Sequence, residues 1–400
     1  MKLGIRPFVP AALAAAVLAA CGGSDNNANV NTKPAYLGAI KVTTYDGSTD
    51  DLLTAGLGKT GLAAAAAPAY ADPLKPTAAE LRRTVIHTSY RGMLDMTADG
   101  GYGTLYGPNV DAKGVVTAGE GKVPGTEYIA FADDGSGRQN VTLMVQVPAS
   151  FDPKKPCVIT ATASGSRGVY AGISTGEWGL KRGCAVAYSD KGTGAAPHDL
   201  TNDTVPLIDG TRTTAAAAGK DAAFNAGLSA AELTAFNAAT PQRFAFKHAH
   251  SGQNAEKDWG KTTLQAVEFA YYVLNERFGA LDNGQRLKSL TPANTIVIAS
   301  SISNGGGAAI AAAEQDTQGL ISGVAVSEPA IEMPANPGVT VQRGGVALAV
   351  TGKTLVDFTT YANLYQSCAA LAPSISSSPY AAAFGAGFAG AALPIAPNRC

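Results

Sequence analysis

The sequence predicts an α/β fold with a mainly parallel sheet, and three features support this prediction. Strand-like apolar runs alternate with helical patterns between residues 127 and 327. Two strand-like runs at 128–131 and 141–147 flank a hairpin turn signal at 133–137. A β-branched run at 295–300 stops at a turn of small residues, and an Ala-rich helical pattern follows it. We therefore expect an N-terminal antiparallel hairpin that leads into parallel strands.

The elements after the hairpin follow the same alternation. In chain order we expect a strand at 156–161, a helix that ends at 178–182 before Gly183, a strand at 184–188, an amphipathic helix at 262–278, strands at 295–300 and 323–327, and a short apolar run at 346–350. The chain then becomes rich in Gly, Ala, Ser and Pro. Because no further strands and helix are evident there, we expect the sheet to be incomplete at the C-terminus.

The first 35 residues have the composition of an export signal and a tether. Lys2 and Arg6 precede an apolar stretch at 8–18 that is too short to span a membrane comfortably. Residues 18–21 end in Cys21 and are similar to a bacterial lipobox, which implies cleavage before Cys21 and lipid attachment to its thiol. An ordinary secretory signal is the alternative.

We accordingly expect a signal peptide over 1–20 and a flexible, Asn-rich tether over 21–35. The protein would be exported, and either secreted, periplasmic or held at the outer membrane through a lipid on Cys21. We expect residues 36–125 to form an N-terminal extension, and residues 35–75 show little periodicity. Within the extension, Thr77 and Glu80 have the spacing of a capping box that opens a short helix through residue 83.

Composition argues against several classes of function. The net charge is −1 and only 15% of residues are charged, against about 25% in a typical soluble protein. No long Lys/Arg run and no Cys/His zinc spacing occurs. We therefore expect no nucleic-acid partner and no metal site.

Four cysteines remain once Cys21 is set aside, and an even number in an exported protein permits two disulfides. Cys157 and Cys184 both start strand-like runs and could lie on neighbouring strands. Cys368 and Cys400 would then form the second bridge. Free buried thiols are the alternative.

The strand, turn and helix around Ser303 have the layout of a nucleophile elbow, which usually reads G-x-S-x-G. Here the turn reads Ser301-Ile302-Ser303-Asn304-Gly305. Small residues suit this turn because the strand and helix approach closely. We predict Ser303 as the nucleophile, with Ser301 as the second candidate and a turn without catalysis as the alternative. Residues 126–400 would form an α/β-hydrolase-like catalytic domain, with an insertion at 190–260 that forms a lid or accessory layer and holds a helical piece at 215–237.

A second small-residue loop follows the strand expected at 156–161. Its Ser164 and Gly165 occupy the place where α/β-hydrolases hold one oxyanion donor. The N–H of Asn304 would be the other donor. A plain Gly/Ser turn is the alternative. Arg167 in the same loop either meets a substrate carboxylate or is solvated at the surface.

The position of the histidines is unusual for this chemistry. His87, His198, His248 and His250 all precede Ser303, whereas α/β-hydrolases have the order Ser, acid, His. Either the base comes from an unusual place, or the chain ends before it. His248 and His250 have the i, i+2 spacing of strand metal ligands, but no third ligand is obvious. Glu328, after the strand at 323–327, is a candidate for the acid.

Three segments of the chain carry a family resemblance. Residues 299–307, 247–260 and 161–168 resemble those of bacterial D-(−)-3-hydroxybutyrate oligomer hydrolases. The resemblance implies hydrolysis of ester bonds in short 3-hydroxybutyrate oligomers, from the dimer upward, to monomers, downstream of polyhydroxybutyrate depolymerases. The family's elbow serine carries over to Ser303. Members of the family are longer than 400 residues, so we expect the acid and the histidine C-terminal to this chain.

The resemblance implies no metal or organic cofactor and a small-molecule ester oligomer as the partner. Two other functions stay open on the residues alone. One is a tannase- or feruloyl-type esterase on the same scaffold, and the other is a lipoprotein that binds oligomers on a hydrolase fold without catalysis.

Overall fold

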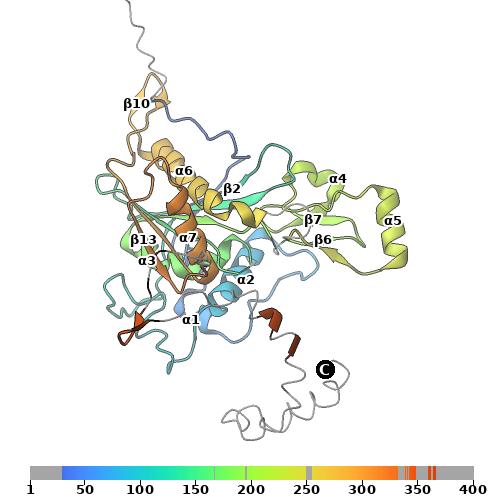
Figure 1. The fold of residues 1–400 in the computed structure, drawn as a ribbon, viewed down its shortest axis with the longest axis horizontal. Helices are drawn as coiled ribbons and strands as arrows, with labels where there is room; N and C mark the ends of the chain where they lie inside the picture. Colours follow the sequence, from blue (N-terminus) through green and yellow to red (C-terminus); the bar gives the residue numbers. More distant parts are fainter. Residues whose placement is uncertain are drawn as a thin grey trace, which may run out of the picture. The chain divides into compact units, whose positions relative to one another are not determined.

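The computed structural model describes residues 29–165, 167–193, 196–248 and 255–331, and short pieces further on (338, 340, 342–347, 359–361 and 364–365). The chain divides into two compact units, Met1–Pro329 and Ala330–Cys400. The first unit holds the mixed α/β fold of Figure 1, on which the candidate site is built.

A seven-stranded sheet forms the centre of the first unit, in the order β1-β2-β3-β5-β4-β12-β13. The pairs β1–β2, β2–β3 and β3–β5 are antiparallel, whereas β5, β4, β12 and β13 run parallel. The expected hairpin followed by parallel strands is thus confirmed. The strands are β1 (Lys41–Tyr45), β2 (Gly125–Ala132), β3 (Val141–Pro148), β4 (Cys157–Thr160), β5 (Ala185–Ser189), β12 (Ile296–Ile302) and β13 (Gly323–Ser327).

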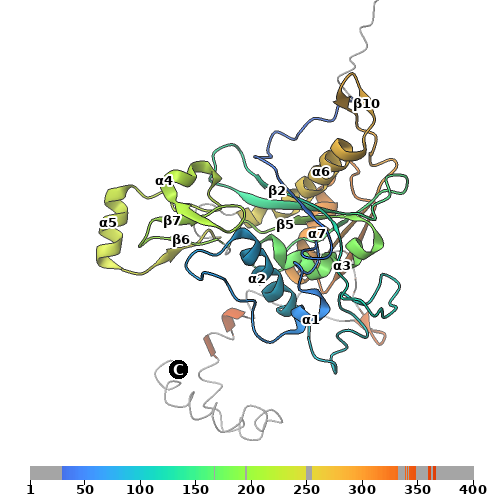
Figure 2. The ribbon, with the colours of Figure 1, turned by 180° about the vertical axis from the view of Figure 1, so that it is seen from behind.

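Helices cover both faces of this sheet. The alternating side chains of β3 show that both faces are apolar. Leu143 and Val145 point into one apolar core, while Met144 between them points into the other. Helix α6 (Trp259–Phe278) packs on the first face together with α7 (Ser303–Gln315). Helices α2 (Ala78–Arg91) and α3 (Ile173–Arg182) belong to the second core. Figures 1 and 2 show α6 and α2 on opposite sides of the sheet.

Several helix ends form where local signals predict them. Thr77 and Glu80 make the expected capping box of α2, although this helix continues to Arg91 rather than ending near residue 83. Its continuation is stabilised by packing, because Ile86 and Tyr90 are fully buried. Helix α3 ends at Gly183, which adopts the left-handed conformation expected of a C-cap.

The N-terminal extension contributes more structure than its weak periodicity indicates. It supplies the edge strand β1 and the short helix α1 (Gly58–Ala63) as well as α2. Residues 29–31 of the expected tether lie against the body of the unit. There Asn31 Nδ2 donates to the Tyr272 carbonyl oxygen. The Asn31 N–H donates to the Arg286 carbonyl oxygen in a small hairpin. The two strands of this hairpin are β10 (Leu281–Asp282) and β11 (Gln285–Arg286).

The insertion contains a small sheet of its own, whereas the sequence predicted only a helical piece there. Its four short antiparallel strands have the order β8-β7-β6-β9. They are β6 (His198–Asp199), β7 (Thr204–Pro206), β8 (Arg212–Thr214) and β9 (Phe244–Ala245). Strands of two or three residues are too short to leave an alternating pattern in a sequence.

The helical piece expected at 215–237 is divided into two helices, as Figure 1 shows. They are α4 (Ala215–Ala218) and α5 (Ala230–Ala239). Gly219 and Gly227 between them have positive φ angles of 52° and 70°. Such backbone interrupts an α-helix, so this segment cannot continue as one helix.

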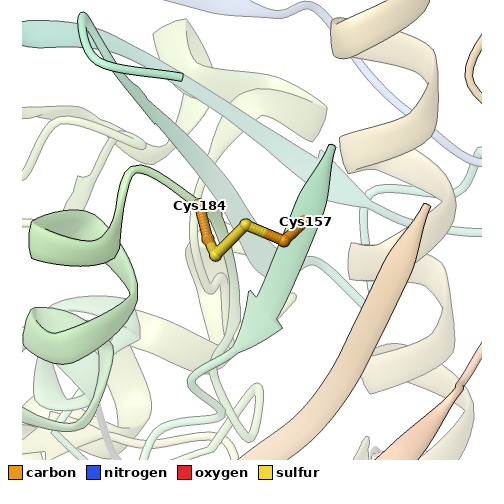
Figure 3. Close-up of a disulfide and its surroundings, with 2 residues drawn as sticks. All are labelled: Cys157 and Cys184. Atoms are coloured by element: carbon orange, nitrogen blue, oxygen red, sulfur yellow. A yellow bond between two sulfur atoms is a disulfide. The ribbon is translucent and has the colours of Figure 1, made fainter. Parts of the chain in front are cut away.

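A disulfide joins Cys157 on β4 to Cys184 directly before β5 (Figure 3). The two strands are parallel neighbours, and the Cα atoms lie 4.8 Å apart. The pairing expected from the strand starts is therefore confirmed for these two residues. Cys368 and Cys400 lie outside the described residues, as do the expected signal peptide and Cys21.

The described part of the second unit contains one antiparallel strand pair, β14 (Gln342–Arg343) and β15 (Val346–Ala347). Strand β15 begins where the apolar run 346–350 was expected, and residues 348–350 are outside the described part. Across both units, no helix among the described residues has the length and apolar character needed to cross a membrane.

Candidate active site

Ser303 lies at the junction of β12 and α7, where the sequence predicts the elbow. Strand β12 ends at Ile302, and Ser303 is the first residue of α7. Its φ angle is +56°, a left-handed conformation that is uncommon outside glycine and recurs at functional turns. The side chain is exposed and makes no hydrogen bond to any described residue. The serine hydroxyl is therefore accessible, and it lies at the N-terminus of a thirteen-residue helix.

Close packing explains the small residues of this turn. A Cβ atom added to Gly305 would lie 2.5 Å from Ser301 Oγ and 2.6 Å from the Thr162 carbonyl oxygen. One added to Gly306 would lie 3.2 Å from the Pro329 Cα atom. The elbow thus requires glycine because β4, β12 and the chain after β13 approach it closely.

Ser301, the second candidate for the nucleophile, has a different role in the structure. It is only 4% exposed, and its Oγ donates a 2.6 Å hydrogen bond to the Thr162 carbonyl oxygen. This bond links β12 to the loop after β4, at the second residue beyond the strand. Ser301 therefore stabilises the elbow from its buried side, whereas Ser303 is the exposed serine.

The side chain of Asn304 connects the elbow to the second predicted loop. Its Oδ1 accepts hydrogen bonds from Ser164 Oγ, at 3.1 Å, and from the Gly165 N–H, at 2.9 Å. The structure thus brings together the predicted residues Ser303, Asn304, Ser164 and Gly165, although the loop and the elbow are 139 residues apart. The Gly165 N–H is engaged by the Asn304 amide, whereas the Asn304 N–H lies in the first turn of α7, where helix N–H groups have no partner within the helix.

Two of the four histidines are held by structural hydrogen bonds. The buried His87 on α2 bonds through Nε2 to the Ala64 carbonyl oxygen at 2.9 Å. His198 on β6 is also buried, with Nε2 3.0 Å from Asp203 Oδ1, and its Nδ1 accepts from the Ala226 N–H. These bonds assign both rings to the packing of their own segments.

The remaining two histidines bear on the metal alternative. His248 is exposed, and His250 lies outside the described residues. Within the described ranges, no group of three or more His, Cys, Asp or Glu side chains could hold a metal ion.

Glu328 lies at the same edge of the sheet as Ser303. Strand β13 pairs with β12 in parallel, with Ile302 opposite Ser327, so Ser303 and Glu328 are the next residues on the two strands. Glu328 is exposed, and its φ angle of +47° is left-handed like that of Ser303. Two non-glycine residues with this backbone conformation therefore end two adjacent parallel strands.

Residues 17–400 match the family model of the 3HB-oligomer hydrolases. The chain belongs to the 3HB-oligomer hydrolase family. The resemblance inferred from residues 299–307, 247–260 and 161–168 is thereby confirmed.

Curated relatives of this 3HB-oligomer hydrolase family member are named D-(−)-3-hydroxybutyrate oligomer hydrolase. The relative from Paracidovorax citrulli is 66% identical over 399 residues, which cover 98% of this chain and 56% of the relative. That from Polaromonas naphthalenivorans is 67% identical, covering 90% of this chain and 52% of the relative. That from Cupriavidus metallidurans is 61% identical, covering 99% and 55%. The chain thus spans about half the length of these relatives. No solved structure matches it.

A cavity of about 660 Å³ in this family member lies beside the candidate site. Its walls come from α2, from β1 to β3, from the insertion and from the loop after β4. Arg167 and Gly168 of that loop line it, whereas Ser303 does not. The loop that contacts Asn304 on one side therefore forms part of the cavity wall on the other.

Sequence reasoning singled out Arg167 but not the other charged groups of this wall. Arg82 on α2 is 7% exposed and forms ion pairs with Asp50, at 2.8 Å, and with Glu127 on β2, at 3.3 Å. Tyr170 donates a 2.7 Å hydrogen bond to the same Glu127, and burial raises the pKa of Tyr170 far above its ordinary value. Arg82 and Glu127 are 45 residues apart on a helix and a strand. No local spacing predicts such a pair.

Asp190 and Lys247 are two further buried charged residues in the wall. Burial raises the pKa of Asp190, and burial lowers the pKa of Lys247. The Lys247 ammonium donates to the Asn140 carbonyl oxygen at 2.6 Å, while Asp190 Oδ1 accepts from the Thr142 and Gly192 N–H groups. Both charges are thus hydrogen-bonded within the wall.

Proposed function

We propose that this chain contains the nucleophile of a serine esterase that hydrolyses ester bonds in short 3-hydroxybutyrate oligomers to monomers. The observation that carries this proposal is the left-handed, exposed Ser303 at the end of β12 in a chain of a hydrolase family. An accessible hydroxyl on a strained strand-to-helix turn is the arrangement that serine esterases use. The names of the relatives from Paracidovorax citrulli and Polaromonas naphthalenivorans support this substrate.

We further propose that the unit has the α/β-hydrolase fold. Two observations support it. The nucleophile turn lies at the carboxyl end of a parallel strand, and the loop that contacts it follows another parallel strand and leads into α3. In α/β-hydrolases this loop and the residue after the nucleophile supply the oxyanion donors.

In the proposed reaction, Ser303 Oγ attacks the ester carbonyl while a general base takes its proton. The negative charge on the carbonyl oxygen is stabilised by the Asn304 N–H at the start of α7. The loop at 164–165 would supply the second donor only if the Gly165 N–H or the Ser164 hydroxyl leaves Asn304 Oδ1, to which both donate in the free protein. The intermediate collapses with loss of the alcohol, leaving a 3-hydroxybutyryl ester on Ser303, which water then hydrolyses. Glu328 is our candidate for the carboxylate that orients the base, because it ends the strand beside that of Ser303.

The Asn304 side chain would act as a positioning group rather than as a donor. Its Oδ1 accepts from Ser164 and Gly165, so it holds the loop at a fixed distance from the elbow. We also propose export of the protein through residues 1–20, with lipid attachment at Cys21, on the sequence pattern alone.

The test is release of 3-hydroxybutyrate from its dimer by the wild type and by Ser303→Ala, measured on the printed chain and on any longer chain that the same gene encodes. We expect Ser303→Ala to lose about 10³-fold or more in kcat, because nothing replaces the nucleophile. Ser301→Ala is the matched control, since it removes a neighbouring serine hydroxyl but keeps the proposed nucleophile. It should retain activity in the folded protein.

Three further results separate the alternatives. Glu328→Gln should lower kcat with little change in KM. Faster hydrolysis of aromatic esters than of the dimer would favour a tannase- or feruloyl-type esterase. A folded, longer chain that neither hydrolyses the dimer nor reacts at Ser303 with a serine-directed phosphonate would refute the proposal in favour of a binding protein.

A further inference from the structure

The charges in the cavity wall differ in how completely they are neutralised. Arg82 is paired with Asp50 and Glu127, and Lys41 is paired with Asp209 at 2.7 Å. Arg167 makes no ion pair with any described residue. Its Nη2 donates to the Ser164 carbonyl oxygen at 3.2 Å and contacts Met93 Sδ. A half-buried guanidinium with one carbonyl acceptor keeps most of its five N–H donors available for an anion.

The rest of the wall is suited to a small organic acid rather than to a polyanion. Apolar side chains from α2, β2 and the insertion line much of the cavity, among them Leu81, Ile129 and Leu207. The volume of about 660 Å³ lies within the range of roughly 300–1,000 Å³ that small-molecule sites occupy. A site of this kind accommodates a methyl-bearing aliphatic chain and one carboxylate.

Arg167 is also connected to the candidate nucleophile through its own loop. Its guanidinium bonds to the Ser164 backbone, Ser164 Oγ bonds to Asn304, and Asn304 follows Ser303. The cavity wall and the elbow are therefore linked through one short loop, residues 164–168.

We infer that this cavity receives the carboxylate end of a linear hydroxyalkanoate ester oligomer and that Arg167 binds its terminal carboxylate. The inference rests on the proposed function, since it takes Ser303 as the place where the ester bond is cut. It assigns Arg167 a role in substrate selection. An oligomer with a free acid end is held in register with the nucleophile, whereas an internal segment of a long polymer offers no carboxylate.

The decisive measurement is equilibrium binding to the Ser303→Ala variant, which keeps the ligand intact. Titration calorimetry compares the 3-hydroxybutyrate dimer and trimer as free acids with the same compounds as methyl esters. Adding Arg167→Gln should raise the Kd of the free acids by about ten- to a hundredfold, the range expected for a charged hydrogen-bonded pair. The Kd of the methyl esters, which carry no carboxylate, should stay within about threefold.

Two variants control for the role of Arg167 in packing. Arg138→Gln removes an exposed guanidinium that does not line the cavity, and it should leave both ligands unaffected. Gly92→Ala keeps every charge but places a Cβ atom 2.4 Å from Arg167 Nη1, which obliges the guanidinium to move. Gly92→Ala should raise the Kd of the free acids and leave the Kd of the methyl esters nearly unchanged.

Several outcomes would overturn the inference. Equal weakening of acid and methyl ester by Arg167→Gln would reduce Arg167 to a packing role. An unchanged Kd, or no binding of the free acid at all, would exclude the site. Failure of the proposed function is separate: acid-selective, Arg167-dependent binding in a protein whose wild type releases no 3-hydroxybutyrate would retain the cavity site and reject the esterase.

Discussion

Replacement of Gly305 by alanine tests the packing that shapes the elbow. Gly305 lies in the first turn of α7, and no left-handed φ angle is recorded for it, so an alanine there is not strained by the backbone. The added Cβ atom would lie 2.5 Å from Ser301 Oγ and 2.6 Å from the Thr162 carbonyl oxygen. One of these atoms is backbone and the other belongs to a short buried side chain, so neither can swing away freely.

The expected cost follows from three contributions. Overpacking of this kind costs about 1–3 kcal/mol. Displacement of the Ser301 hydroxyl breaks its bond to Thr162, which adds about 1 kcal/mol. Alanine has a higher helix propensity than glycine, which raises the free energy of unfolding by about 1 kcal/mol. We therefore expect Gly305→Ala to lower the free energy of unfolding by about 1–3 kcal/mol.

The assay is urea unfolding, with Gly323→Ala as the control because its added Cβ atom meets only Ile298 Cδ1 at 3.4 Å. That control should change stability by no more than about 0.5 kcal/mol. In the double variant with Ser301→Ala, one of the two clashing atoms is gone, so the combined cost should be less than the sum of the single costs. The reasoning would be refuted if Gly305→Ala lowered the free energy of unfolding no more than Gly323→Ala does. It would also be refuted if the costs of Gly305→Ala and Ser301→Ala were strictly additive in the double variant. The clash at Gly305 should also displace the neighbouring Ser303. This displacement should lower kcat, since a misplacement of a catalytic group by about 1 Å can lower the rate about a hundredfold.

Two further predictions concern the first unit. Burial raises the pKa of Asp190 above its ordinary value of about 3.9. At pH values between the ordinary pKa and the raised pKa, the folded state therefore binds the proton of Asp190 more tightly than the unfolded state does. The contribution of Asp190 to the free energy of unfolding consequently falls as pH rises through this window. The free energy of unfolding of Asp190→Asn relative to wild type should therefore increase from pH 4 upward in urea titrations at several pH values; a constant difference would contradict the assignment. Replacing Cys157 and Cys184 together by serine opens a loop of 27 residues and should lower the free energy of unfolding by about 3.5 kcal/mol by the chain-entropy relation, with reduced wild type as the matched comparison. Equal stability of oxidised and reduced protein would count against a stabilising role for this bond.

The features that the sequence predicts correctly depend on neighbouring residues. The capping box at Thr77, the left-handed Gly183 and the junction at Ser303 each involve residues within a few positions of one another. The order of hairpin and parallel strands follows from the alternation of apolar runs, because connections between such elements are short and of fixed handedness. The same alternation made a bond between Cys157 and Cys184 one of two open alternatives, because both residues start strand-like runs, and the structure shows the bond.

The features that the sequence does not predict depend on distant residues. Strand β1 is paired because β2 is in place, and its own residues carry no clear pattern. The four strands of the insertion are two or three residues long and are stabilised by one another. The cavity and its charged wall join α2, β1 to β3, the insertion and one loop, and of these segments only the loop that contains Arg167 is singled out by the sequence.

The candidate site divides in the same way. By itself the sequence determined that a serine follows a buried strand and opens a helix, because backbone geometry at a tight turn is a property of a few consecutive residues. Only the tertiary structure decided that Ser301 is turned inward to Thr162, that Asn304 holds Ser164 and Gly165, and that Arg167 faces a cavity. These contacts join atoms that are far apart along the chain, and it is the packing of the sheet that brings them within hydrogen-bonding distance.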